Sequence, residues 1–170
     1  MLRILIETVA AYGVAVGFGI LFNIKGRTLR VAGVGGAIGW FIYKITSIYM
    51  GFAPGAAFFA AGVSFSVYCE ICARVYMIPA TILSACALIV LVPGFGVYRS
   101  IYEFILEHYS IAGNVMTETL ASAGALALSL VFVTSIFKNF HLAKFLKKFN
   151  ITLKKKNIYL GIIFNIYKIY

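Results

Sequence analysis

The sequence is poor in charge, and especially in acidic side chains. Only 12% of its 170 residues are charged, and its five acidic residues are all glutamates. A soluble domain typically carries about 25% charged residues, so an ordinary soluble fold is excluded. Because aspartate is absent, intramembrane catalysis of the GxGD and DxxD types is also excluded, and no Ser/His pair is placed for nucleophilic chemistry. We therefore predict that the chain is not an enzyme.

Residues that commonly bind metals are also scarce. The sequence has three cysteines and two histidines. Cys69 and Cys72 form a C-x-x-C pair, but zinc needs four ligands, and Cys86, His108 and His141 are remote or unpaired in sequence. A thioredoxin-type motif would open a helix in a soluble βαβ unit, which is absent. We predict neither a metal site nor a cofactor, and redox chemistry at the C-x-x-C pair is the weaker alternative.

Apolar residues make up 62% of the sequence and fall into long runs. Because a helix that crosses a bilayer needs ~20 mostly apolar residues, the runs predict an all-α, polytopic integral membrane protein with about five transmembrane helices. The first run lacks a small-residue cleavage site, so we interpret it as a retained helix and not as a signal peptide. The predicted spans of this transmembrane domain (1–137) are residues 2–22, 29–48, 54–73, 78–92 continuing past a break at 93–96, and 115–137.

Basic residues gather on one predicted side of the membrane. With five crossings, the loop after the first span, the loop before the fourth and the segment 138–170 share a side and hold most of the 15 Lys and Arg residues. The positive-inside rule then places the C-terminus in the cytoplasm of a cell (plasma) membrane. In 138–170, Leu142, Phe145 and Phe149 recur among lysines at helical spacing, which predicts a basic amphipathic tail lying on membrane lipids. The net charge of +10 therefore does not indicate nucleic-acid binding.

The fourth apolar run is interrupted by Pro93, Gly94 and Gly96. Proline removes a backbone donor and clashes with the preceding turn, and glycine carries an entropic cost in a helix. Inside a bilayer such a break persists only where it is buried in protein or lines a wet cavity. Broken apolar segments are the best sequence pointer to a transport site. Residues 78–92 alone are short for a crossing, so the segment either turns back or completes its crossing beyond the break.

The residues around this break form a recognisable pattern. The sequence reads PAT at 79–81, then an apolar run, then LVPG at 91–94 and YRS at 98–100, with FNI at 22–24 and a glycine-rich stretch ending at Trp40 upstream. Over residues 5–137 this pattern resembles the small membrane subunit, or C-terminal module, of the threonine/serine exporter (ThrE-type) family. The resemblance implies secondary-active, ion-coupled export of small polar metabolites together with a larger membrane subunit. Export of dicarboxylates such as succinate, or a non-transporting scaffold role, is the alternative.

The break supplies the candidate transport site. A half-helix beginning after Gly96 would present free N–H groups and a positive dipole end, which suit a carboxylate, and Arg99 would add a bidentate partner. The alternative is a charge ladder of Arg99, Glu103 and Glu107 along one helical face. The candidate substrate-binding or gating residues are Thr81, Pro93, Gly94, Gly96, Tyr98, Arg99 and Ser100.

A proton-coupled transporter needs a carboxylate that binds protons readily because it is partly buried. Glu70 and Glu103 are the candidates. Since Glu70 is four residues before Arg74, an ion pair within the helix is the alternative for it. The hydroxyls of Ser64 and Ser84 either line a path or bond back to their own helix.

Small residues at regular spacing predict how the helices pack. Gly13 and Gly17 form a G-x-x-x-G pair in the first span, and residues 33–39 of the second span are rich in glycine. In lipid, helices associate through close backbone approach at such residues. Packing within the chain explains most of this pattern. The glycine density of the second span predicts either a crowded central helix or an interface between subunits, a homo-oligomer included.

Overall fold

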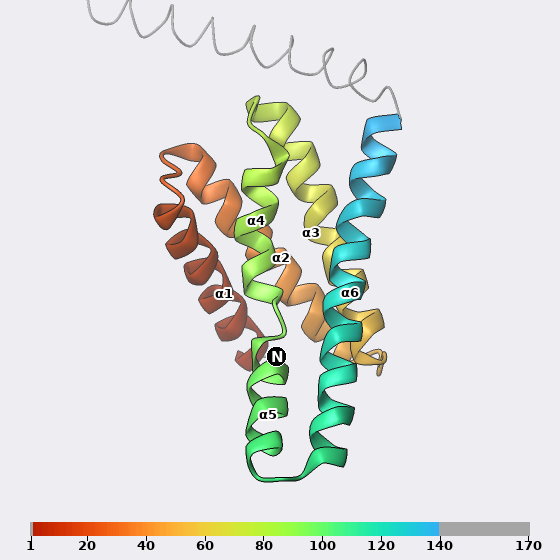
Figure 1. Cartoon of the computed structure of the whole chain (residues 1–170). Helices are drawn as coiled ribbons and strands as arrows, with labels where there is room; N and C mark the ends of the chain where they lie inside the picture. Colours follow the sequence, from red (N-terminus) through yellow and green to blue (C-terminus); the bar gives the residue numbers. More distant parts are fainter. Residues whose placement is uncertain (1, 140–170) are drawn as a thin grey trace, which may run out of the picture. The chain divides into compact units, whose positions relative to one another are not determined.

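The computed structural model describes residues 2–139, and every regular element in this range is an α-helix (Figure 1). Four of these helices are long and apolar enough to cross a membrane, and one bent pair of shorter helices raises the number of candidate crossings to five. The prediction of an all-α, polytopic membrane fold with a broken fourth segment is therefore confirmed. The helices are α1 Leu2–Leu21, α2 Arg27–Ile48, α3 Pro54–Tyr76, α4 Ala80–Leu91, α5 Gly94–Ile105 and α6 Tyr109–Asn139.

The chain divides into two compact units, Met1–Ser135 and Ile136–Tyr170. The first unit holds α1–α5 and most of α6, and the packing described below is that of this unit. The amphipathic tail predicted over 138–170 lies outside the described residues, apart from Lys138 and Asn139 at the end of α6.

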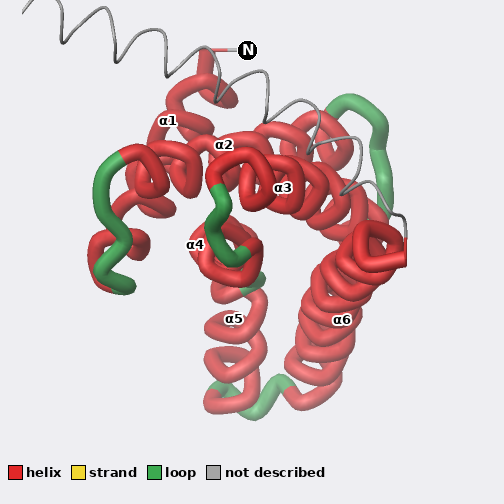
Figure 2. The backbone as a smooth tube through the Cα atoms, turned by 90° about the horizontal axis from the view of Figure 1, so that it is seen from above, coloured by secondary structure: helices red, strands yellow, loops and turns green. Residues whose placement is uncertain are grey.

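Helix α2 is the centre of the packing and contacts α1, α3 and α4 (Figure 2). A Cβ atom at Gly36 would lie 2.7 Å from Cβ of Ala15 in α1, and one at Gly39 would lie 2.8 Å from Cδ1 of Leu91 in α4. Helices that approach this closely leave no space for a side chain at the contact. Of the two interpretations of the glycine-rich second span, the structure supports a crowded central helix, which is α2.

Helix α6 packs on α3 through a second contact between small residues. A Cβ atom at Gly62 would lie 2.8 Å from Cβ of Ser129, which is fully buried. The Ser129 hydroxyl donates a hydrogen bond to the Leu126 carbonyl at 2.6 Å. The rings of Phe59 and Phe132 lie 6.4 Å apart beside it. The C-terminal half of α6 is thereby held against the bundle, while its N-terminal half accompanies α5 (Figure 1).

The break between α4 and α5 lies where the sequence predicts it, and the two helix axes differ by 44°. Pro93 has ψ 56, outside the helical range, and the Gly94 N–H donates to the Val92 carbonyl at 2.7 Å. The prediction that the second half-helix begins after Gly96 is wrong, because α5 begins at Gly94. Pro93 directly precedes the first turn of α5, whose N–H groups have no intrahelical partner, so its missing N–H costs this helix no hydrogen bond.

Candidate functional site

A cavity of about 270 Å³ lies beside the break, and we call it the break cavity. Four helices contribute to its walls. It is lined by Tyr43 of α2, by Pro54 and Phe58 of α3, by Pro93, Phe95, Gly96 and Arg99 at the break and in α5, and by Val115, Glu118, Thr119 and Ser122 of α6.

The start of α5 borders this cavity with polar backbone groups. Within residues 2–139, the first-turn N–H groups of Phe95 and Gly96 have no backbone acceptor, whereas the Val97 N–H donates to the Pro93 carbonyl at 3.3 Å. A helix N-terminus also carries a partial positive charge. Arg99, one turn further along α5, is an exposed residue that also lines this cavity. Together these groups suit a carboxylate or another small anion.

Helix α6 closes the cavity by approaching α5 at Gly96. A Cβ atom at Gly96 would lie 3.0 Å from Cγ2 and 3.2 Å from Cβ of Thr119. The Thr119 hydroxyl donates to the Val115 carbonyl at 2.6 Å, and the Ser122 hydroxyl donates to the Glu118 carbonyl at 2.9 Å. Both residues are buried, and both hydroxyls donate hydrogen bonds within α6. A ligand therefore meets these hydroxyl oxygens as hydrogen-bond acceptors.

The structure brings together only some of the predicted site residues. Pro93, Gly96 and Arg99 line the break cavity, whereas Gly94 lines a different cavity on α1. Tyr98 is 64% exposed and its ring lies 6.2 Å from that of Tyr102.

Two further candidates face other parts of the molecule. Ser100 is buried, donates to the Val97 carbonyl at 2.9 Å and lies 3.6 Å from Sδ of Met116 in α6. Thr81 lies in the first turn of α4, at the opposite end of that helix from the break, beside Asn23 and Lys25. Ser100 therefore packs α5 on α6, and Thr81 is separated from Arg99 by the length of α4.

The two predicted proton-coupling carboxylates both have local partners. Glu70 is buried and forms the ion pair with Arg74 that the spacing predicts. Glu103 contacts His108, with Oε2 3.0 Å from Nδ1. Among residues 2–139, no ion pair joins Arg99 to Glu103 or Glu107, so the predicted charge ladder is not formed. Neither Glu70 nor Glu103 lines the break cavity. Ser64 and Ser84 bond back to their own helices, as the alternative for them predicts.

Comparison with known proteins identifies the family. The family model described as "Threonine/Serine exporter, ThrE" matches residues 7–136, which include the break and every residue that lines the break cavity. The chain belongs to the threonine/serine exporter family. Neither the curated proteins nor the solved structures give a significant match. Membership of this family, inferred from residues 79–81 and 91–100, is therefore confirmed, and the chain is a membrane protein of an exporter family.

For a member of the exporter family, Glu118 is the most informative residue that the sequence analysis did not single out. It lies in α6, lines the break cavity with Arg99, and is the only acidic residue of that apolar helix. Ionisable residues at membrane depth are costly and usually functional. The signal was present in the sequence, because the predicted last span, 115–137, contains this one glutamate.

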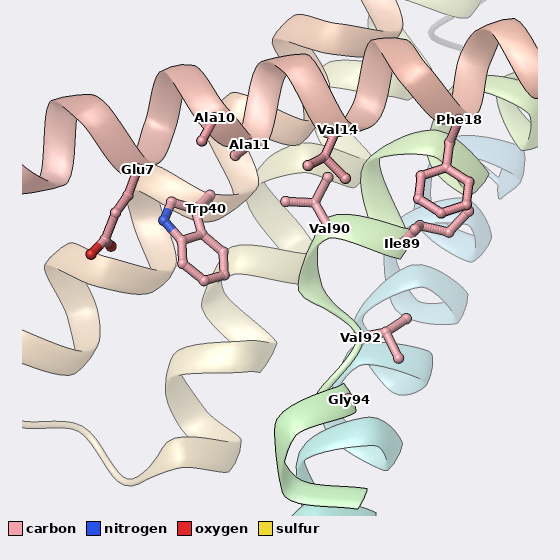
Figure 3. Close-up of a pocket in the computed structure, with 10 residues that line it drawn as sticks. All are labelled: Glu7, Ala10, Ala11, Val14, Phe18, Trp40, Ile89, Val90, Val92 and Gly94. Atoms are coloured by element: carbon pink, nitrogen blue, oxygen red, sulfur yellow. The ribbon is translucent and has the colours of Figure 1, made fainter. Parts of the chain in front are cut away.

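A second and larger cavity, of about 580 Å³, lies on the other side of the break (Figure 3). We call it the Trp40 cavity. It is mostly apolar, and its polar side chains are Glu7 of α1 and Trp40 of α2. Its volume falls within the range of small-molecule sites. In this exporter-family chain the break is thus bordered by two cavities. The Trp40 cavity is lined by Glu7, Ala10, Ala11, Val14, Phe18, Trp40, Ile89, Val90, Val92 and Gly94.

Proposed function

We propose that the chain is the small subunit of a secondary-active exporter of threonine, serine and related small polar metabolites. It works with a larger membrane subunit in the cell membrane. The observation that carries this proposal is the break cavity, where the N-terminus of α5, Arg99 and Glu118 meet beside a helix break. Discontinuous helices that aim their N-termini at an anionic group are typical of secondary transporters.

The substrate carboxylate is received by α5. The unpaired N–H groups of Phe95 and Gly96 donate to one carboxylate oxygen, and the guanidinium of Arg99 binds the carboxylate from the second turn. The interaction is strong because a charge-assisted, bidentate hydrogen bond gains more where water is partly excluded. Any small carboxylate satisfies this geometry, so succinate belongs in the test beside threonine and serine.

Glu118 is the carboxylate best placed to couple transport to protons. It lines the same cavity as Arg99, so its carboxylate competes with that of the substrate for the Arg99 guanidinium. Glu70 and Glu103 are less suited to this role, because each already has a partner outside the cavity. Coupling therefore depends on Glu118 in this proposal.

A second subunit is supported by the surface of α5. Phe95, Tyr98, Phe104 and Ile105 are 61–75% exposed within the described chain. The same helix carries Arg99 and Glu103, so contact with lipid alone would suit only part of its surface. A protein partner that covers α5 and the adjoining half of α6 satisfies both the apolar and the charged side chains.

The orientation rests on the basic residues. The α1–α2 turn and the α3–α4 turn lie at the same end of the unit (Figure 1), and they carry Lys25, Arg27, Arg30 and Arg74. By the positive-inside rule this end is cytoplasmic. The break cavity then lies nearer the outer face, and the C-terminal tail is in the cytoplasm.

The test is efflux of threonine, serine and succinate from cells that express the chain with and without a larger membrane protein of the same exporter family. We expect efflux of threonine and serine to require both chains. Arg99→Gln should lower the rate by about tenfold or more, which corresponds to loss of ~1.4 kcal/mol of carboxylate binding, and Arg99→Lys should restore part of it.

Arg30→Gln is the matched control, because Arg30 is an exposed arginine of α2 that lines none of these cavities. Equal efflux by the Arg99→Gln and Arg30→Gln proteins, at equal abundance, contradicts the role of Arg99. A rate that is the same with and without the chain contradicts the exporter function. If the partner becomes less abundant in cells that lack the chain, but Arg99→Gln leaves efflux unchanged, the chain is a scaffold subunit.

A further inference from the structure

At the edge of the Trp40 cavity lies a group of charged and aromatic side chains that the proposed function does not use, and Glu7 and Trp40 of this group line the cavity. Glu7 Oε2 lies 2.9 Å from Nζ of Lys44, and Glu7 Oε1 lies 3.1 Å from Nε of Arg3. The same Lys44 ammonium lies over the Trp40 ring, 5.1 Å from its centroid. The side chains of Glu7 and Lys44 are only 24% and 23% exposed, whereas that of Arg3 is 91% exposed.

A carboxylate and an indole face around an ammonium ion form a recognition site for a primary amine. The carboxylate supplies the opposite charge, and the ring supplies the cation–π attraction, which strengthens when water is excluded. In this structure the ammonium belongs to the chain itself, since it is that of Lys44. An α-amino acid carries a chemically equivalent group.

The cavity itself leaves room beside this site. Glu7 and Trp40 both line the wall of the Trp40 cavity, and Lys44 does not (Figure 3). The Nε1 atom of Trp40 is buried and makes no hydrogen bond among the described residues. It lies on the edge of the ring nearer to Glu7 (Figure 3). A ligand in the cavity therefore meets the side chain of Glu7 and the ring of Trp40 together.

The lysine side chain is suited to leaving this site. Its charge is carried on a flexible four-carbon stem, so the ammonium can move without a change in the helix. A buried ion pair gains little net free energy, because desolvation offsets most of the attraction. Exchange of one ammonium for another at Glu7 keeps the number of charges in the site constant.

We propose that the Trp40 cavity is a second substrate site, in which Glu7 and Trp40 bind the ammonium group of an amino acid that is not at that moment held by Arg99, and that Lys44 occupies this site until the amino acid displaces it. This inference rests on the proposed function and narrows its substrate class. A site that recognises an ammonium group selects α-amino acids, and a dicarboxylate does not displace Lys44. Val92 and Gly94 line the same cavity, so a ligand at Glu7 also lies next to the break.

The experiment uses the fluorescence of Trp40, which is the single tryptophan of the chain. The purified full chain in lipid nanodiscs is titrated with L-threonine and with three matched compounds: 1-aminopropan-2-ol, which lacks the carboxylate, 3-hydroxybutyrate, which lacks the ammonium, and succinate. We expect threonine and the amino alcohol to change the emission, because each displaces the cation above the ring. We expect 3-hydroxybutyrate and succinate to leave it unchanged.

Three variants sharpen the result. Lys44→Met removes the competing ammonium and should lower the half-saturating concentration of threonine by about tenfold, as expected for loss of ~1.4 kcal/mol of competition. Glu7→Gln should abolish the response. Arg3→Gln is the matched control, because it removes an exposed cation from the same carboxylate while Lys44 stays over the ring. If Lys44→Met does not fold, as judged by circular dichroism, Lys44→Gln serves the same purpose.

An unchanged emission with every compound in both the parent chain and the Lys44 variant overturns the inference, and so does an equal response to succinate. The same titration separates this inference from the proposed function. If threonine efflux depends on the chain but is unaffected by Glu7→Gln, only the ammonium site is wrong. If Trp40 responds to ammonium compounds and no efflux occurs, the site stands and the exporter function fails.

Discussion

Gly96→Ala tests whether α5 and α6 meet at the break as closely as the structure has them. The added Cβ atom would lie 3.0 Å from Cγ2 and 3.2 Å from Cβ of Thr119, and it would also meet Oγ1. The Thr119 side chain cannot turn aside freely, because its hydroxyl donates to the Val115 carbonyl at 2.6 Å. The two helices must therefore separate, or this hydrogen bond must break.

The expected loss of stability follows from these contacts. Overpacking of a close contact costs ~1–3 kcal/mol, and loss of one hydrogen bond costs ~1 kcal/mol. The greater helix propensity of alanine returns at most ~1 kcal/mol. We expect a net destabilisation of ~1–2 kcal/mol, which lowers the midpoint of thermal unfolding by roughly 2–8 °C.

The assay is thermal unfolding of the purified chain in detergent, followed by circular dichroism at fixed protein and detergent concentration. Gly124→Ala is the matched control, because no atom lies within 4 Å of a Cβ placed there, and it should leave the midpoint unchanged or raise it. In the double variant Gly96→Ala/Thr119→Ala most of the clash is removed, so we expect a favourable coupling of ~1 kcal/mol or more. Two results would refute the close approach of α5 and α6. One is that Gly96→Ala has the same unfolding midpoint as Gly124→Ala. The other is that the loss of stability in the double variant equals the sum of the losses in Gly96→Ala and Thr119→Ala.

Three further predictions concern other helices. Gly36→Ala should lower the unfolding midpoint, because the new Cβ would lie 2.7 Å from that of Ala15, whereas Gly13→Ala should not, because its surroundings are open; both are measured by the same thermal assay. Glu118→Gln should lower threonine efflux by about tenfold in cells, because the break cavity loses its carboxylate. Glu70→Gln should lower stability by roughly 1–3 kcal/mol through loss of its ion pair with Arg74, and at equal abundance it should leave threonine efflux unchanged.

The break and the membrane class could be predicted from the sequence because both are local properties. Pro93 lies inside an apolar run, where its missing N–H and its ring kink or break a helix, and long apolar runs exclude an ordinary soluble fold. The ion pair of Glu70 with Arg74 could be predicted for the same reason, since the two residues lie one helical turn apart. In each case the residues that determine the feature lie close together in the sequence.

The composition of the two cavities could not be predicted in the same way, because it depends on contacts between helices. Whether Glu118 faces Arg99 is decided by the rotation of α6 about its own axis, which the close contacts at Gly62 and Gly96 fix. Gly96 itself was interpreted as part of the break, although its role is to admit Thr119. The Glu7–Lys44 pair is an intermediate case: both residues are similarly far from the short turn between α1 and α2, so an antiparallel pair of helices brings them together.

The course of the fourth segment is the point on which sequence alone left two alternatives. Helix α4 has 12 residues, and at ~1.5 Å per residue it is ~18 Å long, too short for a hydrocarbon core of ~30 Å. A re-entrant segment would have to reverse its direction at the break, but the axes of α4 and α5 differ by only 44°. Helix α5 continues away from the bundle and α6 returns beside it (Figure 1). The geometry therefore favours a broken span that α5 completes.

This path predicts that the turn between α5 and α6 lies on the side of the membrane opposite to the turn between α1 and α2. Ser110→Cys, at an exposed position beside the α5–α6 turn, should react in intact cells with a thiol reagent that does not cross membranes. Lys25→Cys, in the α1–α2 turn, should react only after the cells are opened. Both variants are made in a chain whose three native cysteines are replaced by alanine, so that the labelling reports the new residue alone. Labelling of both positions from the same side would mean that the segment turns back. The N-terminus of α5 would then open to the same side as the α1–α2 turn, and Arg99 could not lie near the outer face.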